Sequence, residues 1–422
     1  MAKDIAKEAG AEKHIHEASV TDIQKQLAGK TSQISIIRLV DSLIASAFEQ
    51  RASDIHIDPE EDKIVARFRI DGVLHDSFTF LKDLQSELIT RIKILSGMRT
   101  DEHQAAQDGR FKITITGHEN IDVRISIAPT YYGENCVMRL LAGRSQELTL
   151  ESLGYSPENL ERLNRAMARP YGMILATGPT GSGKTTTLYG ILQKLNTRDI
   201  SIITIEDPIE YSIDGIDQIQ VNARTGLTFA QGLRFILRQD PNIIMVGEIR
   251  DDETASIAVN AAMTGHRVLS TLHTNDAATT LPRLLDMGVE PFLIASTVNI
   301  AIGQRLVRTI CVECRVEREL SPLAMDNLKS LVSPALLKGQ TSFSTGVGCK
   351  KCDGSGFRGR IGIHEIIEIT EPIRELIMKR ATASELKAGA VKAGMKTMLE
   401  DGLEKALRGL TTIEEVLRVF HE

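Results

Sequence analysis

The sequence predicts an α/β protein built from several domains, and three observations indicate this. The chain has 422 residues, which is too long for one simple hydrophobic core. Between residues 173 and 304, short apolar segments alternate with helical ones, the pattern of a mostly parallel sheet with helices on its faces. Four cysteines follow in two C-x-x-C pairs, and the chain then reads as helical to its end.

The expected organisation has six parts. In chain order they are a polar lead-in (1–33), an α+β domain (34–147), a linker with a helix (148–172), the α/β core (173–304), a tetracysteine subdomain (305–362) and a C-terminal helical region (363–422). The sequence shows no internal repeat and no low-complexity tract.

Composition limits the possible functions. Hydrophobic residues make up 42% and charged residues 25%, as in ordinary globular proteins. Apolar runs fall short of 18 residues, so we expect no membrane-spanning helix. The first residues form no apolar stretch, so we expect no signal peptide and a cytoplasmic location. The net charge of −6 argues against nucleic acid as the main direct partner.

The first domain combines helical and strand patterns. Residues 35–53 place apolar side chains on one helical face, namely Ile36, Ile37, Val40, Leu43, Ile44 and Ala47. Strand patterns follow at 54–59, 63–72 and 72–78, then a helix at 86–98, then strands across 109–141 with turns at Gly117 and Gly133.

Local signals also mark the helices outside the core. Ser156, Pro157 and Glu158 form a helix start signal in the linker. In the C-terminal region, the expected helix breaks are Gly389, Gly394, Gly402 and Gly409.

A glycine-rich stretch in the core has the spacing of a phosphate-binding loop. Gly178, Gly183, Lys184 and Thr185 match G-x-x-x-x-G-K-[ST], and an apolar strand precedes the loop while a helix follows it. Glycines let backbone N–H groups surround a phosphate, lysine reaches the β- and γ-phosphates, and threonine offers its hydroxyl to Mg²⁺. The expected nucleotide contacts are Gly178, Pro179, Thr180, Gly181, Ser182, Gly183, Lys184, Thr185 and Thr186.

Acidic residues end two of the core strands. The segment 243–251 places Glu248 at a strand end, with Gly247 where a phosphate-loop enzyme usually has aspartate, and the segment 203–211 carries Glu206, Asp207 and Glu210. Ligands bind at the carboxyl ends of strands in open α/β sheets, so these acids are candidates for the Mg²⁺ and water roles. The alternative is that they are solvated loop acids.

Two histidines and two arginines are further candidates. His266 and His273 flank an apolar strand, and a lone histidine is more often structural. Arg234 and Arg238 lie four residues apart, hence on one helical face, which is also typical of a surface salt-bridge face.

Four segments in this order carry a resemblance to the secretion and type IV pilus ATPase superfamily, specifically its type II secretion and pilus-assembly branch. The family's Walker A, Asp box, Walker B with glycine before glutamate, and His box match 178–185, 203–211, 243–251 and 265–274. The resemblance covers about residues 34–422. It implies a RecA-like ATPase domain with a phosphate loop, preceded by a smaller PAS-like α+β domain.

The resemblance implies roles for single residues. Lys184 and Thr185 bind phosphate and Mg²⁺, Glu248 supports the Mg²⁺ shell, and Glu210 polarises the attacking water, although these two acids could exchange roles. His273 and His266 sense the γ-phosphate, and Arg234 and Arg238 approach the nucleotide.

The family also forms a hexameric ring in which arginines of a neighbouring subunit's first domain reach the phosphates, as arginine fingers do. The matching residues are Arg124 and Arg139, with Arg110 as a weaker third candidate. Without the family, arginines on strands are normally solvent-facing. Two segments, 52–60 and 69–72, also match and are interpreted as structural.

The two cysteine pairs predict a metal site. Cys311, Cys314, Cys349 and Cys352 present four thiolates, which suits a closed structural Zn²⁺ site. The alternatives are a redox pair or buried free thiols, and the fifth cysteine, Cys136, is expected in the core. Assembly ATPases of the family carry such an insert, which favours that branch.

The expected function is therefore a cytoplasmic, hexameric ATPase that uses ATP and Mg²⁺ and acts through a membrane platform protein to assemble pilin or pseudopilin fibres. It would associate peripherally with the inner membrane. The alternatives are a motor for DNA uptake or conjugative transfer, which the 4% aromatic content disfavours, and a non-catalytic scaffold. Family members usually have a further N-terminal docking domain, whereas about 33 polar residues precede the match here, so we expect a trimmed or compact member.

Overall fold

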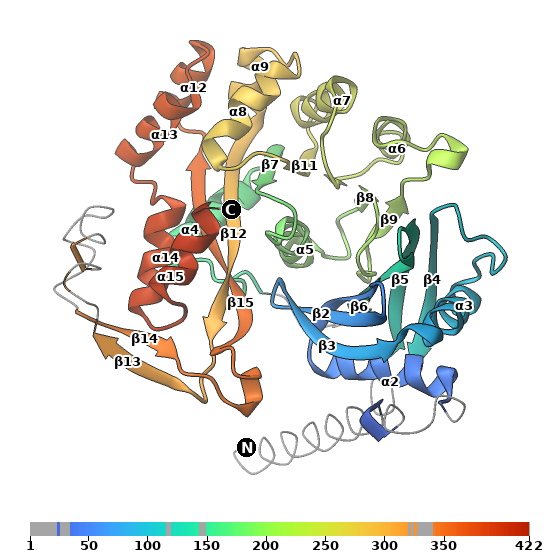
Figure 1. Ribbon diagram of the computed structural model, residues 1–422. Coiled ribbons are helices and arrows are strands. Elements are labelled where there is room, and N and C mark those ends of the chain that lie inside the picture. The colour runs from blue at the N-terminus through green and yellow to red at the C-terminus, as the bar shows by residue number, and fades with distance from the viewer. Residues whose placement is uncertain are drawn as a thin grey trace. The chain divides into compact units, whose positions relative to one another are not determined.

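The computed structural model describes residues 23–25, 34–114, 120–142, 149–319, 322, 325–326 and 341–421. The chain divides into two compact units, Met1–Ser145 and Gln146–Glu422 (Figure 1). The expected turn at Gly117 and all of the polar lead-in except residues 23–25 lie outside the described residues.

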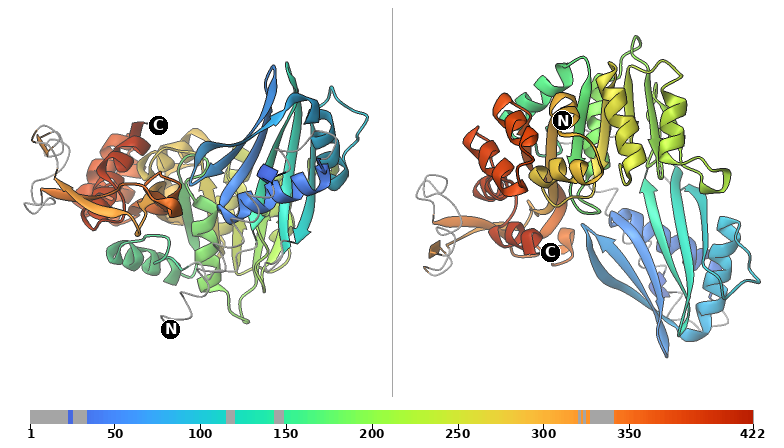
Figure 2. Two further views of the ribbon diagram at one scale, coloured as in Figure 1. Left: turned by 60° about the horizontal axis from the view of Figure 1, so that its bottom comes forward. Right: turned by 90° about the horizontal axis from the view of Figure 1, so that it is seen from above.

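The first unit is one antiparallel sheet backed by two helices. The helices are α2 (Ile36–Glu49) and α3 (Gln85–Ser96), with a 3-10 turn η2 (Lys82–Leu84) leading into α3 (Figure 2). Across the sheet, the strands are β3 (Val73–Leu81), β2 (Lys63–Ile70), β1 (Ala52–Pro59), β6 (Gly133–Ala142), β5 (Asn120–Thr130) and β4 (Gln107–Thr114).

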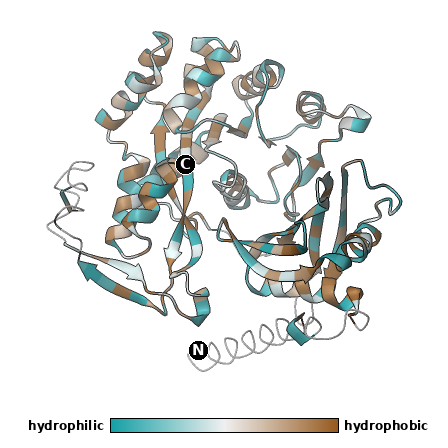
Figure 3. Ribbon diagram, in the orientation of Figure 1, coloured by the Kyte–Doolittle hydropathy of each residue, from teal (hydrophilic) through white to brown (hydrophobic). Residues whose placement is uncertain are grey.

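Alternation of apolar and polar residues gives this sheet two different faces. Ile55 and Ile57 of β1 join the core formed with the helices, so the residues between them face the other way. Figure 3 shows the same banding of hydrophobic and hydrophilic residues along these strands. Ile37, expected on the buried face of α2, lies at the edge of that face and is 54% exposed.

The second unit is a seven-stranded sheet with helices on both faces. Across the sheet, the strands are β15 (Phe357–Glu368), β12 (Val298–Ile310), β7 (Gly172–Thr177), β11 (Arg267–Leu272), β10 (Ile243–Val246), β8 (Ile202–Glu206) and β9 (Asp217–Gln220). All neighbouring pairs are parallel except β12 with β15. The carboxyl ends of β7, β11, β10 and β8 therefore share one edge, where parallel sheets bind ligands.

The helices segregate by face. On one side α4 (Pro157–Ala168) and α5 (Lys184–Leu195) share a core with Ile174 and Ala176 of β7. The other side is covered by α6 (Phe229–Ile236), α7 (Asp252–Met263), α8 (Ala277–Asp286), α9 (Pro291–Thr297), α12 (Glu371–Met378) and α13 (Ala383–Lys392). As the start signal predicts, the Ser156 hydroxyl caps α4 by accepting a hydrogen bond from the Asn159 N–H at 3.2 Å.

Two long strands connect the core to the cysteine region. The boundaries expected at residues 304 and 362 fall inside β12 and β15, which lie side by side in Figure 1. Between these strands come the hairpin β13 (Arg315–Glu319) and β14 (Ser342–Gly346) and the 3-10 turn η4 (Lys350–Cys352), and the chain ends in α14 (Met398–Leu407) and α15 (Ile413–His421). These parts pack as one unit.

The four C-terminal glycines differ in role. Gly394 and Gly409 follow α13 and α14 with φ of 89° and 70°, the left-handed conformation that ends helices. The sequence also predicts helix breaks at Gly389 and Gly402, but these two residues lie inside α13 and α14. A Cβ at either position would come within 2.7 Å of a packed side chain, so these glycines permit close helix packing.

No helix among the described residues combines the length and the apolar character needed to cross a membrane.

Candidate functional site

The glycine-rich loop connects the buried strand β7 to α5, and its backbone requires glycine. Gly178, Gly181 and Gly183 have φ of 146°, 80° and 86°. A Cβ on Gly178 would also lie 2.4 Å from the Gln304 carbonyl oxygen. Residues with a Cβ rarely adopt these φ angles, so glycine at these positions permits the tight loop in which backbone N–H groups converge.

The start of α5 offers unpaired backbone donors. Its N-cap is Gly183, which has no side chain to cap the first N–H groups, so these groups and the helix dipole favour an anion. The Ser182 hydroxyl is buried nearby with no hydrogen-bond partner among the described residues. These features fit the phosphates of a nucleotide.

Lys184 is positioned over the loop. Its Nζ donates hydrogen bonds to the carbonyl oxygens of Gly178 at 2.8 Å and Pro179 at 3.0 Å. Burial lowers the pKa of Lys184, and the negative charge of Glu248 partly offsets that effect. Lys184 follows β7 and Glu248 follows β10, so both lie at the carboxyl edge of the parallel sheet, where a phosphate–Mg²⁺ site is expected.

Glu248 follows β10 and is largely buried. Its carboxylate accepts a hydrogen bond from His273 Nε2 at 2.9 Å and pairs with Arg250 at 2.5 Å. The preceding residue, Gly247, packs closely against β8. A Cβ at this position would lie 3.3 Å from Glu206 Cα and from the Ile205 carbonyl oxygen. This close approach favours glycine at position 247.

The acids after β8 have different environments. Glu206 is 2% exposed and accepts hydrogen bonds from Thr204 Oγ1 at 2.6 Å, from Gln218 Nε2 at 3.1 Å and from the Tyr189 hydroxyl. Burial raises the pKa of Glu206, although these hydrogen bonds oppose the rise. The Glu206 carboxylate is therefore engaged with neighbouring side chains inside the protein. Asp207, in contrast, is exposed to solvent.

Glu210 is half-buried, whereas Glu206 is buried. Its backbone N–H donates to the hydroxyl of Tyr189, a residue of α5, at 3.4 Å. Tyr189 thus connects the helix that follows the phosphate loop to the segment that carries Glu210.

The two histidines lie at opposite ends of β11. His273 follows the strand's carboxyl end and reaches Glu248. His266 precedes the amino end, where its Nδ1 lies 3.0 Å from the Ala261 carbonyl oxygen. The structure therefore does not bring His266 to the phosphate loop.

Arg234 and Arg238 make other contacts. Arg234 pairs with Glu253 of α7 at 2.7 Å. Arg238 stacks over the Phe235 ring and donates to the Arg234 carbonyl oxygen at 2.8 Å. Among the interactions found for the described residues, neither arginine contacts the phosphate loop.

The arginines of the first unit form a row across its sheet. Strand register places Arg110 opposite Arg124, Arg124 opposite Arg139, and Arg139 opposite Asp54, which in turn faces Arg69. All lie on the face away from the helices. Arg139 Nε donates to Asp54 at 3.0 Å, and one carboxylate among four cations leaves the row strongly basic.

The four paired cysteines meet in one cluster. Their sulfur atoms all lie within 4.8 Å of one another, with Cys311–Cys349 and Cys314–Cys352 separations of 3.8 Å. A tetrahedral ion bound to sulfur at about 2.3 Å would separate the sulfurs by roughly 3.8 Å, so the cluster fits such an ion. The sulfurs are too far apart to be joined as disulfides, so the four cysteines are present as free thiols.

Backbone donors support the thiolates. The N–H groups of Cys349 and Gly356 lie 3.2 and 3.3 Å from Cys352 Sγ. Burial raises the pKa of Cys352, but these bonds outweigh it and leave a pKa of about 7.

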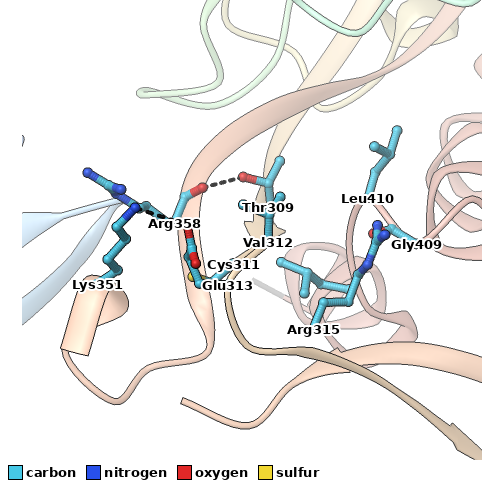
Figure 4. Close-up of a pocket in the computed structure, with 10 residues that line it drawn as sticks. Thr309, Cys311, Val312, Glu313, Arg315, Lys351, Arg358, Gly409 and Leu410 are labelled. Atoms are coloured by element: carbon cyan, nitrogen blue, oxygen red, sulfur yellow. Dashed lines mark hydrogen bonds and ion pairs between the residues drawn. The ribbon is translucent and has the colours of Figure 1, made fainter. Parts of the chain in front are cut away.

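A pocket beside the cluster is lined by residues that include Glu313, Arg315 and Lys351 (Figure 4). Cys136 is buried in the core of the first unit, as expected.

Comparison with known proteins gives a consistent result. The family model described as "Type II/IV secretion system protein" matches residues 29–418. The "Type IV pilus assembly ATPase PilB" of Thermus thermophilus is 44% identical over 99% of this chain and 48% of that protein. The "Type II secretion system protein E" of Pectobacterium carotovorum is 46% identical over 92% of this chain and 76% of its own length. The chain therefore spans about half the length of the first relative and three quarters of the second.

Solved structures share the fold. The Legionella pneumophila ATPase DotB superposes with a TM-score of 0.68 at 22% identity, covering 94% of this chain and 98% of that one. The pilus retraction motor PilT, solved with bound ADP, has a TM-score of 0.60 at 27% identity, covering 89% and 95%. The α/β ATPase fold expected from the sequence is confirmed.

Proposed function

Because the chain belongs to the type II/IV secretion system protein family, we propose that it is an ATPase that drives assembly of pilin or pseudopilin fibres. The observation that carries the proposal is the convergence of the phosphate loop, Lys184 and Glu248 at the carboxyl ends of β7 and β10. The names of the relatives support both the ATPase activity and the pilus or secretion role.

The proposed mechanism assigns each group one task. The loop N–H groups and Lys184 would bind the phosphates of ATP. The Thr185 hydroxyl and Glu248 would hold Mg²⁺, which would neutralise charge on the phosphates. Glu210, which is half-buried, would orient the attacking water, and His273, which contacts Glu248, would couple Glu248 to the γ-phosphate. His266 and the Arg234–Arg238 pair are left out because of where they lie.

The basic row of the first unit supplies the remaining charge. Arg124 and Arg139, with Arg110, would act as arginine fingers across a subunit boundary of a homohexamer. A Zn²⁺ ion in the four-cysteine cluster would be structural, because four thiolates leave no open position. Contact with a membrane platform protein would bring this otherwise cytoplasmic ring to the inner membrane.

The test is steady-state ATPase activity of the purified chain as a function of protein concentration. We expect activity per chain to rise as the ring assembles. Glu210→Gln should lower kcat about 100-fold while ATP still binds, as loss of a water-orienting carboxylate does. Glu248→Gln should instead raise the Mg²⁺ concentration needed for half-maximal activity.

Arg124→Ala tests the shared site, and Arg67→Ala is its matched control. Arg67 lies on the same face of the sheet but outside the row, paired with Asp58 at 2.8 Å. Arg124→Ala should lower kcat about 1,000-fold or more, the range of an arginine finger, and Arg67→Ala should not. Full turnover by a monomer indifferent to Arg124 would refute the shared site.

A further inference from the structure

Gln304 lies on β12 directly beside the phosphate loop. The register pairs Gly303 with Thr177, the last residue of β7, so Gln304 comes level with the first loop residue. Its side chain is buried, with 2% of the residue exposed. A buried amide has both a donor and an acceptor to satisfy, so its partners are structurally significant.

The amide of Gln304 connects the loop to the helix that follows it. Its Nε2 donates to the Ser182 carbonyl oxygen at 2.7 Å, and its Oε1 accepts from Thr187 Oγ1 at 2.8 Å. Ser182 belongs to the loop, whereas Thr187 lies in α5. One side chain therefore fixes the loop against the base of the helix.

A second hydrogen bond fixes which way the amide faces. Burial raises the pKa of Tyr155, so its hydroxyl stays protonated and donates to Thr187 Oγ1 at 3.2 Å. The single hydroxyl hydrogen of Thr187 is then directed to Gln304 Oε1. Nε2 must consequently face Ser182, which is the orientation that the loop carbonyl requires.

The Ser182 carbonyl controls the direction of the next N–H group. In a trans peptide the C=O of one residue and the N–H of the next point in opposite directions. With the Ser182 oxygen held toward Gln304, the Gly183 N–H is turned away from β12. Gly183 has φ of 86°, and glycine is the residue whose adjoining peptide reorients most easily, so the orientation needs an external hold.

We propose that Gln304 is a positioning residue of the nucleotide site: by holding the Ser182 carbonyl, it keeps the Gly183 N–H directed at the phosphates. It does not touch nucleotide itself. The inference rests on the proposed function, because it requires that the loop binds a nucleoside triphosphate.

Gln304→Met keeps the approximate length of the side chain but removes both hydrogen bonds. The matched control is Asn299→Leu on the same strand, where another buried amide bonds to the Tyr171 carbonyl and to Arg169, away from the loop. Each variant of the full chain is tested for binding of a fluorescent ATP analogue, for ATPase activity and for thermal melting. Both variants should melt at lower temperature than the wild type.

We expect Gln304→Met to weaken binding of the analogue about tenfold, the effect of one hydrogen bond to a well-fixed group, whereas Asn299→Leu binds as the wild type does. Thr187→Val should weaken binding in the same direction, and Thr187→Ser, which keeps the hydroxyl, should restore it. These threonine variants keep the inference testable if Gln304→Met does not fold.

Two outcomes would overturn the inference, and they can be told apart. If the wild type binds the analogue and Gln304→Met binds it equally well while melting lower, Gln304 has only a structural role and the proposed function stands. If the wild type binds no nucleotide, the proposed function fails and the inference with it.

Discussion

At the scale of single residues, Gly247 shows how packing against a neighbouring strand constrains the residue before Glu248. A Cβ at this position would lie 3.3 Å from the β8 backbone, closer than most Cβ contacts. We predict that Gly247→Ala lowers the free energy of unfolding by about 1–2 kcal/mol, because β8 and β10 must separate slightly. Urea unfolding measures this change, and an unaltered midpoint would contradict the packing argument.

The sequence identifies single residues only where their partners are close in the chain. The phosphate loop is contiguous, so its spacing alone predicts it. Gln304 acts on Ser182 across 122 positions, and Asp54 meets Arg139 across 85, so no local pattern marks either residue. The sequence does contain the information that His266 and His273 lie far apart, because one precedes and the other follows the six-residue strand β11, and the two ends of a strand lie at opposite edges of the sheet.

At the scale of elements, α15 is held against β12 by a buried carboxylate. Glu415 accepts hydrogen bonds from Arg308 Nε at 3.0 Å and from Arg418 Nε at 3.0 Å, and its side chain is 1% exposed. Burial alone would raise the pKa of Glu415, but the hydrogen bonds from both arginines lower it to about 2.

This shift predicts a pH-dependent stability. The folded pKa lies below the value of about 4.5 in the unfolded chain, so the stabilisation is complete above pH 4.5 and is lost as pH falls toward 2. Glu415→Gln should therefore lower the free energy of unfolding by about 2 kcal/mol at pH 7 and by less at pH 3. Urea unfolding at both pH values tests this, with Glu414→Gln, an exposed neighbour on α15, as the control. An equal loss at both pH values would contradict it.

The elements themselves were largely predictable, and the domain boundaries beyond the core were not. Short apolar runs bounded by turn residues gave β7, β8, β10 and β11 close to their observed limits. The boundaries expected at 304 and 362 lie inside β12 and β15. The pairing of β12 with β15 determines the structure of this region. These strands are far apart in the sequence, so no local sequence pattern predicts that they pair.

At the scale of the whole molecule, each unit has its own hydrophobic core, and within the second unit β12 joins two sites. Gln304 lies beside the phosphate loop, and Cys311 follows the far end of the strand. Seven residues of extended chain span about 23 Å. The cysteine cluster and the phosphate loop are thus connected by one strand, and none of the four cysteines belongs to the loop.

This separation predicts the effect of removing the metal. Purified chain should contain one Zn²⁺, and Cys349→Ser should contain none, because a four-thiolate site loses closure with one ligand gone. Cys136→Ser, which alters a buried cysteine of the first unit, should keep the metal.

The metal-free chain should melt about 5 °C or more below the metal-bound chain, because the binding energy of a structural zinc contributes to folding. Nucleotide affinity should change by no more than about twofold, because the loop keeps all its contacts. A large loss of affinity on chelation would mean instead that β12 transmits strain from one site to the other.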